Sequence, residues 1–145
     1  MTIPELPARS SEAGKSFDHA ESEASASVVK KMASPGANAR TAYAIGQLRN
    51  VRLNDGIIAY LRGIDATLEP FGGRFIIHGS RKEVLEGAPT DDLVIIGFPT
   101  IEAARLWYAS PAYQALIGLR TQGAEADIFL MQGVDGTHRA TDILQ

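Results

Sequence analysis

Apolar and polar residues alternate along residues 41–52, which read "TAYAIGQLRNVR". A period of two is typical of a β-strand that has one face against a core. The pattern therefore predicts a first strand whose side chains fall into two groups on opposite sides. One side carries Tyr43, Ile45, Gln47, Arg49 and Val51, and the other carries Ala44, Gly46 and Leu48.

The period then changes to that of a helix. Between residues 57 and 71, large apolar residues recur at steps of four and three, which predicts one apolar stripe along a helix. Asn54 or Asp55 would cap the start of this helix, and the proline and glycines of residues 70–73 would end it. The stripe consists of Ile57, Leu61, Ile64, Leu68 and Phe71.

Two further strands are predicted in "RFIIHGSRKEVLE" and "LVIIGF", joined by the turn-forming segment "GAPTDD". Gly79 interrupts the first of these strands. Because a glycine inside a strand usually marks a bulge or a bend, we expect the strand to turn there. Its continuation "SRKEVLE" would then form the longer arm of a hairpin.

A second helical segment follows. Thr100 is the expected cap, and Glu102 lies near the positive end of the helix dipole. The segment is interrupted at Ser110 and Pro111, where serine can cap and proline suits the first position of a new turn. The helix is predicted to resume through "PAYQALIGLRTQGA", and "ADIFLMQGV" is predicted as the last strand.

The predicted order is β-α-β-β-α-β, which is the split βαβ arrangement of an α+β protein with a four-stranded antiparallel sheet. Two helices on one side can cover only one face of this sheet. In "LVIIGF" and "DIFLM", however, large apolar residues point to both faces. Each one left in water would forgo roughly 1.5 to 3 kcal/mol of burial. A second copy packed face to face would cover the open side, so we expect a homodimer.

Composition divides the chain into three parts. Residues 1–41 are rich in Ala, Ser and Glu and are interpreted as a flexible or loosely packed arm, with a short helix over residues 20–33. Residues 42–134 carry the predicted domain. Residues 135–145 are interpreted as a tail.

Charge and cysteine content exclude several classes of function. The 145 residues carry a net charge of −3 and contain no cysteine, so neither nucleic-acid binding nor disulfides nor thiolate metal sites are expected. The first residues lack the continuous apolar segment of an export signal or a membrane span. We therefore expect a cytoplasmic protein that does not associate with membranes.

His78 is the best single candidate for chemistry. The chain has three histidines and no histidine pair with metal-ligand spacing, so no metal site is expected. Alternation along the second strand places His78 on the same face as Arg74 and Ile76. A neutral imidazole there would serve as a general base toward an acidic small molecule. The alternative is a strand histidine that is hydrogen-bonded at the sheet edge or the dimer interface.

Aromatic and cationic residues of the two helices would join His78 around a cleft between helices and sheet. Aromatic residues at such spacing serve more often as core and interface anchors. An apolar cleft with a few polar groups, however, is typical of a small-ligand pocket. Arg120 would either bind a carboxylate or extend along the helix surface. The candidate ligand-binding residues are Tyr60, Arg74, His78, Trp107, Tyr108, Tyr113 and Arg120.

Several stretches are distinctive, namely "FGGRF", "LEG", the helix containing "FPT", "EAA", "WY", "SP" and "YQ", and Arg120. Together they resemble the bacterial domain-of-unknown-function 1330 family, which is part of the dimeric α/β-barrel superfamily. The resemblance covers residues 42–134. It implies a ferredoxin-like fold and a barrel built from two subunits. His78 and Ala112 stand where relatives often have arginine and glutamate, so any family chemistry at these positions would differ here.

Two functions of different class remain open. The first is a non-enzymatic dimer that binds a small molecule. The second is a small enzyme, either cofactor-free or recruiting haem or flavin, that acts as an oxygenase or isomerase on an aromatic or carboxylate metabolite. The wider superfamily includes haem-degrading and cofactor-free oxygenases, lactone isomerases and chlorite-converting haem enzymes. Such a spread of activities on one fold does not select a reaction.

Overall fold

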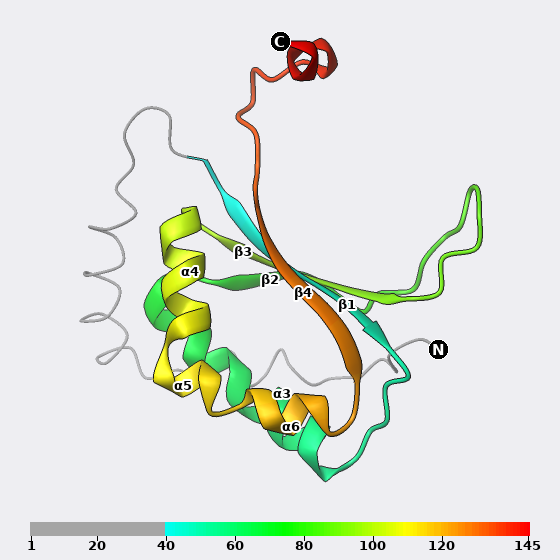
Figure 1. Cartoon of the computed structure of the whole chain (residues 1–145), viewed down its shortest axis with the longest axis vertical. Helices are drawn as coiled ribbons and strands as arrows, with labels where there is room; N and C mark the ends of the chain where they lie inside the picture. The colour runs from blue at the N-terminus through cyan, green and yellow to red at the C-terminus, as the bar shows by residue number, and fades with distance from the viewer. Residues whose placement is uncertain (1–39) are drawn as a thin grey trace.

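The computed structural model describes residues 40–145, which include all four predicted strands. The expected arm, with its helix over residues 20–33, lies outside the described residues except at its last two positions. The strands form one antiparallel sheet in the order β2-β3-β1-β4. Figure 1 shows the helices gathered on one face of this sheet. The α+β class and the ferredoxin-like arrangement are confirmed. The strands are β1 (Ala42–Arg49), β2 (Arg74–His78), β3 (Asp92–Phe98) and β4 (Glu125–Gln132).

Helix α3 (Asp55–Leu68) follows the predicted stripe. Its cap is Asn54, whose Oδ1 accepts a hydrogen bond from the backbone N–H of Ile57 at 3.0 Å. A 3₁₀ turn, η1 (Glu69–Phe71), continues the chain, and Gly72 then adopts a φ of +72°. Because this left-handed conformation favours glycine, the helix ends where the sequence predicted.

The second helical segment is divided into α4 (Ile101–Ala109), α5 (Pro111–Gln114) and α6 (Ile117–Thr121). Thr100 caps α4, and Ser110 caps α5 ahead of the proline, as predicted. The expectation of one continuous helix after Pro111 is wrong. The backbone N–H of Leu116 bonds three residues back to the carbonyl of Tyr113 at 2.8 Å, so a tight turn separates α5 from α6.

The first strand ends earlier than its alternation suggested. Asn50 has a φ of +52°, outside the strand region, and the chain turns there. Val51 was expected on the same side as Tyr43 and Ile45, but it lies beyond the strand and is buried. Our prediction for Val51 is therefore wrong, because the turn at Asn50 redirects it toward the helices.

Strand β2 contains an irregularity that the sequence did not reveal. Phe75 pairs with Ile96, and Ile77 pairs with the adjacent Ile95, so one extra residue is inserted between them. A β-bulge of this kind shifts the alternation of side chains by one position. His78 therefore lies on the same face as Phe75, and the prediction that it shares a face with Arg74 and Ile76 is wrong.

The segment after β2 differs from the predicted hairpin arm. Gly79 has a φ of +65° and donates a backbone hydrogen bond to Leu93 at 2.9 Å, which closes the sheet at this point. Residues 80–91 then form a long irregular loop, which extends away from the sheet (Figure 1). The predicted strand "SRKEVLE" is wrong, because after Gly79 these residues have no neighbouring strand with which to pair.

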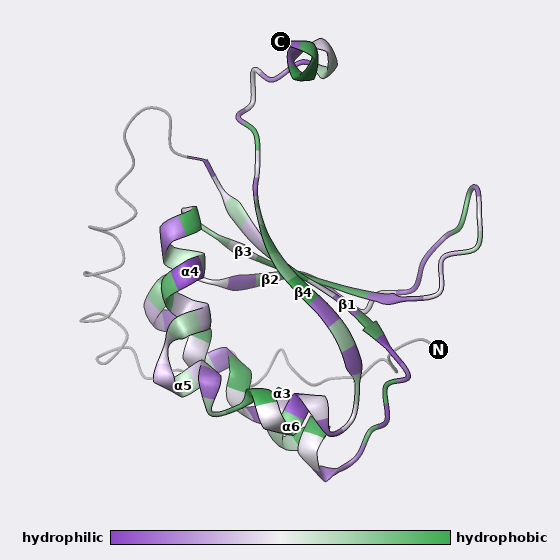
Figure 2. Cartoon of the chain, in the orientation of Figure 1, coloured by the Kyte–Doolittle hydropathy of each residue, from purple (hydrophilic) through white to green (hydrophobic). Residues whose placement is uncertain are grey.

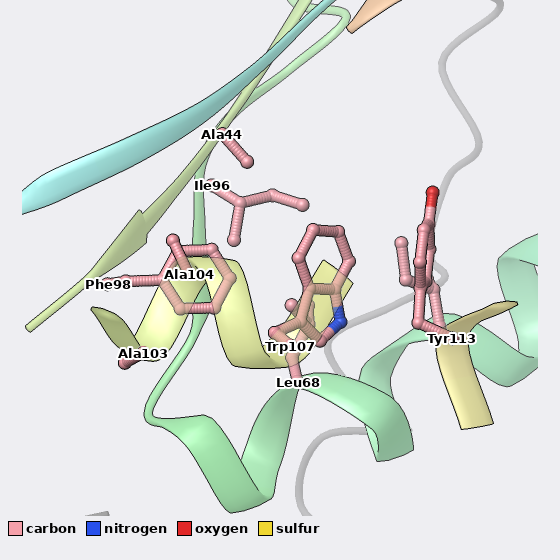
Figure 3. Packing of buried hydrophobic residues seen from close by; sticks show 9 residues of the cluster. Ala44, Leu68, Ile96, Phe98, Ala103, Ala104, Trp107 and Tyr113 are labelled. Atoms are coloured by element: carbon pink, nitrogen blue, oxygen red, sulfur yellow. The ribbon is translucent and has the colours of Figure 1, made fainter. Parts of the chain in front are cut away.

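The core lies between the sheet and the helices. Figure 3 shows Trp107 between Phe98 and Tyr113, above Leu68 of α3. The ring centroids of Trp107 lie 5.3 Å from those of Phe98 and 4.2 Å from those of Tyr113. Small residues of β1 and α4 admit these large rings, and the buried cluster consists of Ala44, Ile64, Leu68, Ile96, Phe98, Ala103, Ala104, Trp107 and Tyr113.

The opposite face of the sheet carries apolar side chains with no cover among the described residues. Figure 2 shows β4 as hydrophilic near its start and hydrophobic farther along. Three residues of this face are substantially exposed, namely Ile76 at 43%, Phe129 at 38% and Met131 at 53%. We call this surface the open face. The strand pairings place on it Tyr43, Ile45, Ile76, Ile77, Leu93, Ile95, Phe129 and Met131.

The chain after β4 leaves the domain and ends in a 3₁₀ helix, η2 (Ala140–Leu144), which stands apart from the sheet in Figure 1. Ile143 and Leu144 of this helix are exposed.

Candidate functional site

A cavity of about 80 Å³ lies between the sheet and the helices. Its walls are almost entirely apolar, with side chains from all four strands, from helices α3 to α6 and from the turn after β1. The polar groups at its surface come from four residues, Tyr60, His78, Tyr113 and Arg120. An apolar cavity with a few convergent polar groups is typical of a small-ligand site. Its apolar wall includes Val51, Ile57, Ile64, Val94, Ile96 and Ile128.

Trp107 joins the core to this cavity. Its indole Nε1 donates a hydrogen bond to Oγ1 of Thr67 at 3.0 Å, and Thr67 in turn donates to the carbonyl of Ile64 at 2.7 Å. Trp107 and Thr67 are both buried. The indole is therefore fixed in one orientation, which gives the cavity a rigid wall and confirms the core-anchor interpretation of Trp107.

Tyr60 of α3 and Tyr113 of α5 face each other. Their hydroxyl oxygens are 2.8 Å apart, and their rings meet edge to face at 6.1 Å. Burial raises the pKa of Tyr60 well above its ordinary value, and the neighbouring Tyr113 raises it further. The nearby Arg120 acts in the opposite direction but does not cancel these effects. Tyr60 therefore remains a neutral hydrogen-bonding group.

Arg120 is the buried cation of the site. Only 7% of its surface is exposed, and its Cζ lies 5.9 Å from the centroid of the Tyr60 ring. Burial alone would lower the pKa of the guanidinium, but Tyr113 and Tyr60 together raise it. Its Nε has no hydrogen-bond partner among residues 40–145. Arg120 does not extend along the helix surface to water but remains charged at the cavity.

His78 reaches the cavity wall because of the bulge in β2. Its ring stacks on that of Phe75, with centroids 4.4 Å apart and an angle of 16° between the planes. The side chain is exposed to solvent and also borders the cavity. His78 therefore borders both the cavity and the solvent, so its imidazole is within reach of the cavity interior, which is the geometric requirement for a general base.

Two of the candidate residues lie outside the cavity wall. Arg74 pairs with Gly97 on the opposite side of the sheet and is exposed, so it belongs to the open face. Tyr108 is half-buried on α4, with its ring 6.1 Å from Trp107 and 5.5 Å from Tyr113. Tyr108 therefore packs on the aromatic cluster without bordering the cavity. Arg74 and His78 lie on opposite faces of the sheet.

Sequence reasoning missed Asp92. This residue begins β3, is 1% exposed, and has an Oδ2 without a hydrogen-bond partner among the described residues. His78 pairs with Val94, so Asp92 is its diagonal neighbour on the same face. Diagonal neighbours have Cα atoms roughly 7 to 8 Å apart, within reach of long side chains. In the sequence Asp92 looked like part of a solvated turn, and only the strand register reveals its position.

The dimensions of the site limit what it holds. Its volume of about 80 Å³ lies well below the roughly 300 Å³ at which common cofactor and drug sites begin, so a haem or flavin does not fit inside it. Within residues 40–145, no three His, Asp or Glu side chains gather in a way that would hold a metal ion. No helix in this range is long and apolar enough to cross a membrane.

Comparison with known proteins places this domain in a family. The family model described as domain of unknown function (DUF1330) matches residues 41–134. The chain belongs to this family. The matched residues contain the whole sheet, helices α3 to α6 and every residue of the cavity wall named above. No curated protein matches the chain.

Solved structures give the same fold without a function. A protein of unknown function from Rhodopseudomonas palustris, RPA0582, is 18% identical and aligns with a TM-score of 0.51, over 74% of this chain and 93% of its own. A methylated form of RPA0582 is 17% identical with the same TM-score, over 95% of this chain and all of its own. The similarity supports the fold of the DUF1330 domain alone.

Proposed function

We propose that this DUF1330 protein binds a small, largely apolar molecule in the cavity between sheet and helices. The observation that carries the proposal is the convergence of the polar groups on otherwise apolar walls. Tyr60, Tyr113 and Arg120 come from three different helices, yet their polar ends meet at one side of the cavity. Burial of a polar group costs stability unless the group is hydrogen-bonded, and Nε of Arg120 has no such partner among residues 40–145.

We also propose that the protein works as a homodimer through the open face. Covering an exposed apolar side chain contributes roughly 1.5 to 3 kcal/mol, and three residues of this face are more than a third exposed. Arg49 forms ion pairs with Asp91 at 3.3 Å and with Asp127 at 3.0 Å along its border. An apolar centre with a charged border is the usual anatomy of a protein interface. A second copy is the partner that offers the same surface in return.

Native mass spectrometry of gently purified protein tests both parts together. The expected result is a dimer with additional mass from a retained small molecule. A dimer that carries no ligand and binds none from a metabolite extract would count against the cavity. A monomer at micromolar concentration would count against the interface.

Phe129→Glu tests the interface directly. A charge at this position on each copy would face an apolar surface, so the variant is expected to sediment as a monomer. Leu106→Glu is the matched control, because Leu106 is similarly exposed at 46% but lies on α4, away from the open face. Dissociation by the control and not by Phe129→Glu would refute the proposed interface.

A cofactor-free acid-base enzyme is the second candidate function. Its support is the position of His78 on the cavity wall with the Asp92 carboxylate as diagonal neighbour on the same face. In this role His78 would take a proton from the bound molecule, and Asp92 would orient the imidazole. His78→Ala should then abolish turnover of an identified substrate and leave the oligomeric state unchanged. Unchanged turnover would remove His78 from the mechanism.

A further inference from the structure

Arg120 is a buried positive charge that lacks a negative partner among the described residues. Arg49, by contrast, is at the surface and pairs with two carboxylates. None of the ion pairs within residues 40–145 includes Arg120, and its Nε makes no hydrogen bond there. Placing an unpaired charge in a protein interior is strongly unfavourable. The arrangement therefore calls for an anion that residues 40–145 do not supply.

The groups around Arg120 have hydrogen-bond donors in excess. A guanidinium has five N–H donors and no acceptor. The hydroxyls of Tyr60 and Tyr113 have two hydrogens between them, and their mutual bond at 2.8 Å uses one. The second hydrogen has no acceptor in any hydrogen bond of the described residues. A molecule that complements Arg120 and the two hydroxyls must supply hydrogen-bond acceptors, and a carboxylate has about four lone-pair sites on its two oxygens.

The rest of the cavity selects a small organic anion over an inorganic one. Apart from His78, the walls beyond Arg120 and the two tyrosine hydroxyls are aliphatic and aromatic, which suits a short hydrocarbon body. A fully hydrated inorganic anion would gain nothing from these walls. An engineered apolar cavity of about 150 Å³ in another protein holds benzene. The cavity of about 80 Å³ is therefore matched to a body of a few carbon atoms.

We propose that the natural ligand is a short-chain carboxylic acid, bound as the carboxylate by Arg120 and the hydroxyl pair of Tyr60 and Tyr113. This inference rests on the proposed function, because it names the chemical class that the cavity binds. Arg120 supplies the charge and a planar pair of donors, the free hydroxyl hydrogen supplies a further donor, and the aliphatic wall excludes water from the contact.

Propionate and propionamide form a matched pair of probes, since they have nearly the same shape and differ in charge. Trp107 is the chain's single tryptophan, and it lies on the cavity wall, so its fluorescence reports binding. Titrations at constant ionic strength should give an affinity for propionate at least about tenfold higher than for propionamide. Butyrate with butyramide, and benzoate with benzamide, extend the test to larger bodies.

The outcomes separate this inference from the proposal on which it rests. Equal binding of acid and amide would refute the carboxylate site and leave a cavity that binds small molecules. Binding of neither member in any of the three pairs would overturn both. A preference for carboxylates that is the same for all sizes and disappears in sodium chloride would indicate non-specific ion attraction, which also refutes the site.

Variants assign the preference to Arg120. Arg120→Met should abolish the preference for propionate over propionamide while leaving the Tm equal or higher, because an unpaired buried charge is replaced by an apolar side chain of similar length. Arg105→Met is the matched control, since Arg105 is exposed on α4 and is not part of the cavity wall. It should retain the full preference. Tyr113→Phe, which keeps the ring and removes one hydroxyl, should weaken propionate binding several-fold. Retention of the preference in Arg120→Met would refute the assignment.

Discussion

Thr67→Val tests whether a single hydrogen bond fixes the rigid wall of the cavity. Thr67 is 7% exposed and Trp107 is 2% exposed, and the indole N–H of Trp107 donates to Oγ1 of Thr67 at 3.0 Å. Valine has nearly the shape of threonine but lacks the oxygen. The substitution therefore removes the acceptor without opening a large cavity, and the buried indole N–H is left without a partner.

The expected cost follows from the burial of both groups. Leaving a buried donor unsatisfied costs about 1 to 3 kcal/mol in unfolding free energy. For a domain of roughly 100 residues, each kcal/mol lowers the Tm by about 4 to 8 °C. Thr67→Val should therefore lower the Tm by at least about 4 °C. The added methyl group of valine returns less than about 1 kcal/mol of this loss.

A double-mutant cycle isolates the hydrogen bond from these packing effects. Trp107→Phe removes the indole N–H, so Thr67→Val should cost much less in that background than in the parent protein. Urea unfolding followed by circular dichroism measures all four proteins, since two of them lack the fluorescent tryptophan. An equal cost of Thr67→Val in both backgrounds would show that the bond contributes nothing to stability and would refute this reasoning.

Three further predictions concern a cap, a close contact and a buried hydroxyl. Asn54→Ala should lower the unfolding free energy by about 1 kcal/mol through loss of the α3 cap, and an unchanged urea midpoint would contradict this. Gly73→Ala places a Cβ 2.7 Å from the ring of Phe98 and should cost about 1 to 3 kcal/mol, whereas Gly136→Ala, which meets nothing within 4 Å, should be nearly neutral in the same assay. The pKa of Tyr60 is raised above its value of 10.0 in an unfolded chain, so above about pH 10 the folded state retains a proton that the unfolded state loses. Stability should therefore fall as the pH rises past this value, and Tyr60→Phe should make the fall less steep; an identical slope in both proteins would argue against the shift.

Local signals in the sequence correctly located the ends of several elements. Asn54, Thr100 and Ser110 each cap a helix through their own side chains, and this preference depends on the next three residues alone. The alternation in β1 likewise predicted which residues share a face of the sheet up to Arg49. The fold could be predicted because these short-range preferences agree with the apolar periodicity.

The composition of the site depended on contacts that no local pattern reports. The bulge in β2 is visible only in its register with β3, because no glycine stands next to Phe75 or Ile77 to indicate it in the sequence. Arg120 could not be recognised as buried from its own segment, because its environment is supplied by α3 through Tyr60. All seven candidates were expected around a cleft between helices and sheet, and Arg74 alone lies on the opposite face, because the bulge separates its face from that of His78.

The extra residue in β2 also determines on which face of the sheet each later side chain of the strand lies. A strand assigns its residues to opposite faces by odd and even position, and an insertion reverses that assignment for everything downstream. If residues 74–78 alternated strictly, His78 would lie on the open face together with Arg74, whereas its observed pairing with Val94 puts it on the face that borders the cavity. The bulge thus decides that the imidazole of His78 borders the cavity and does not lie on the exposed apolar face of the sheet.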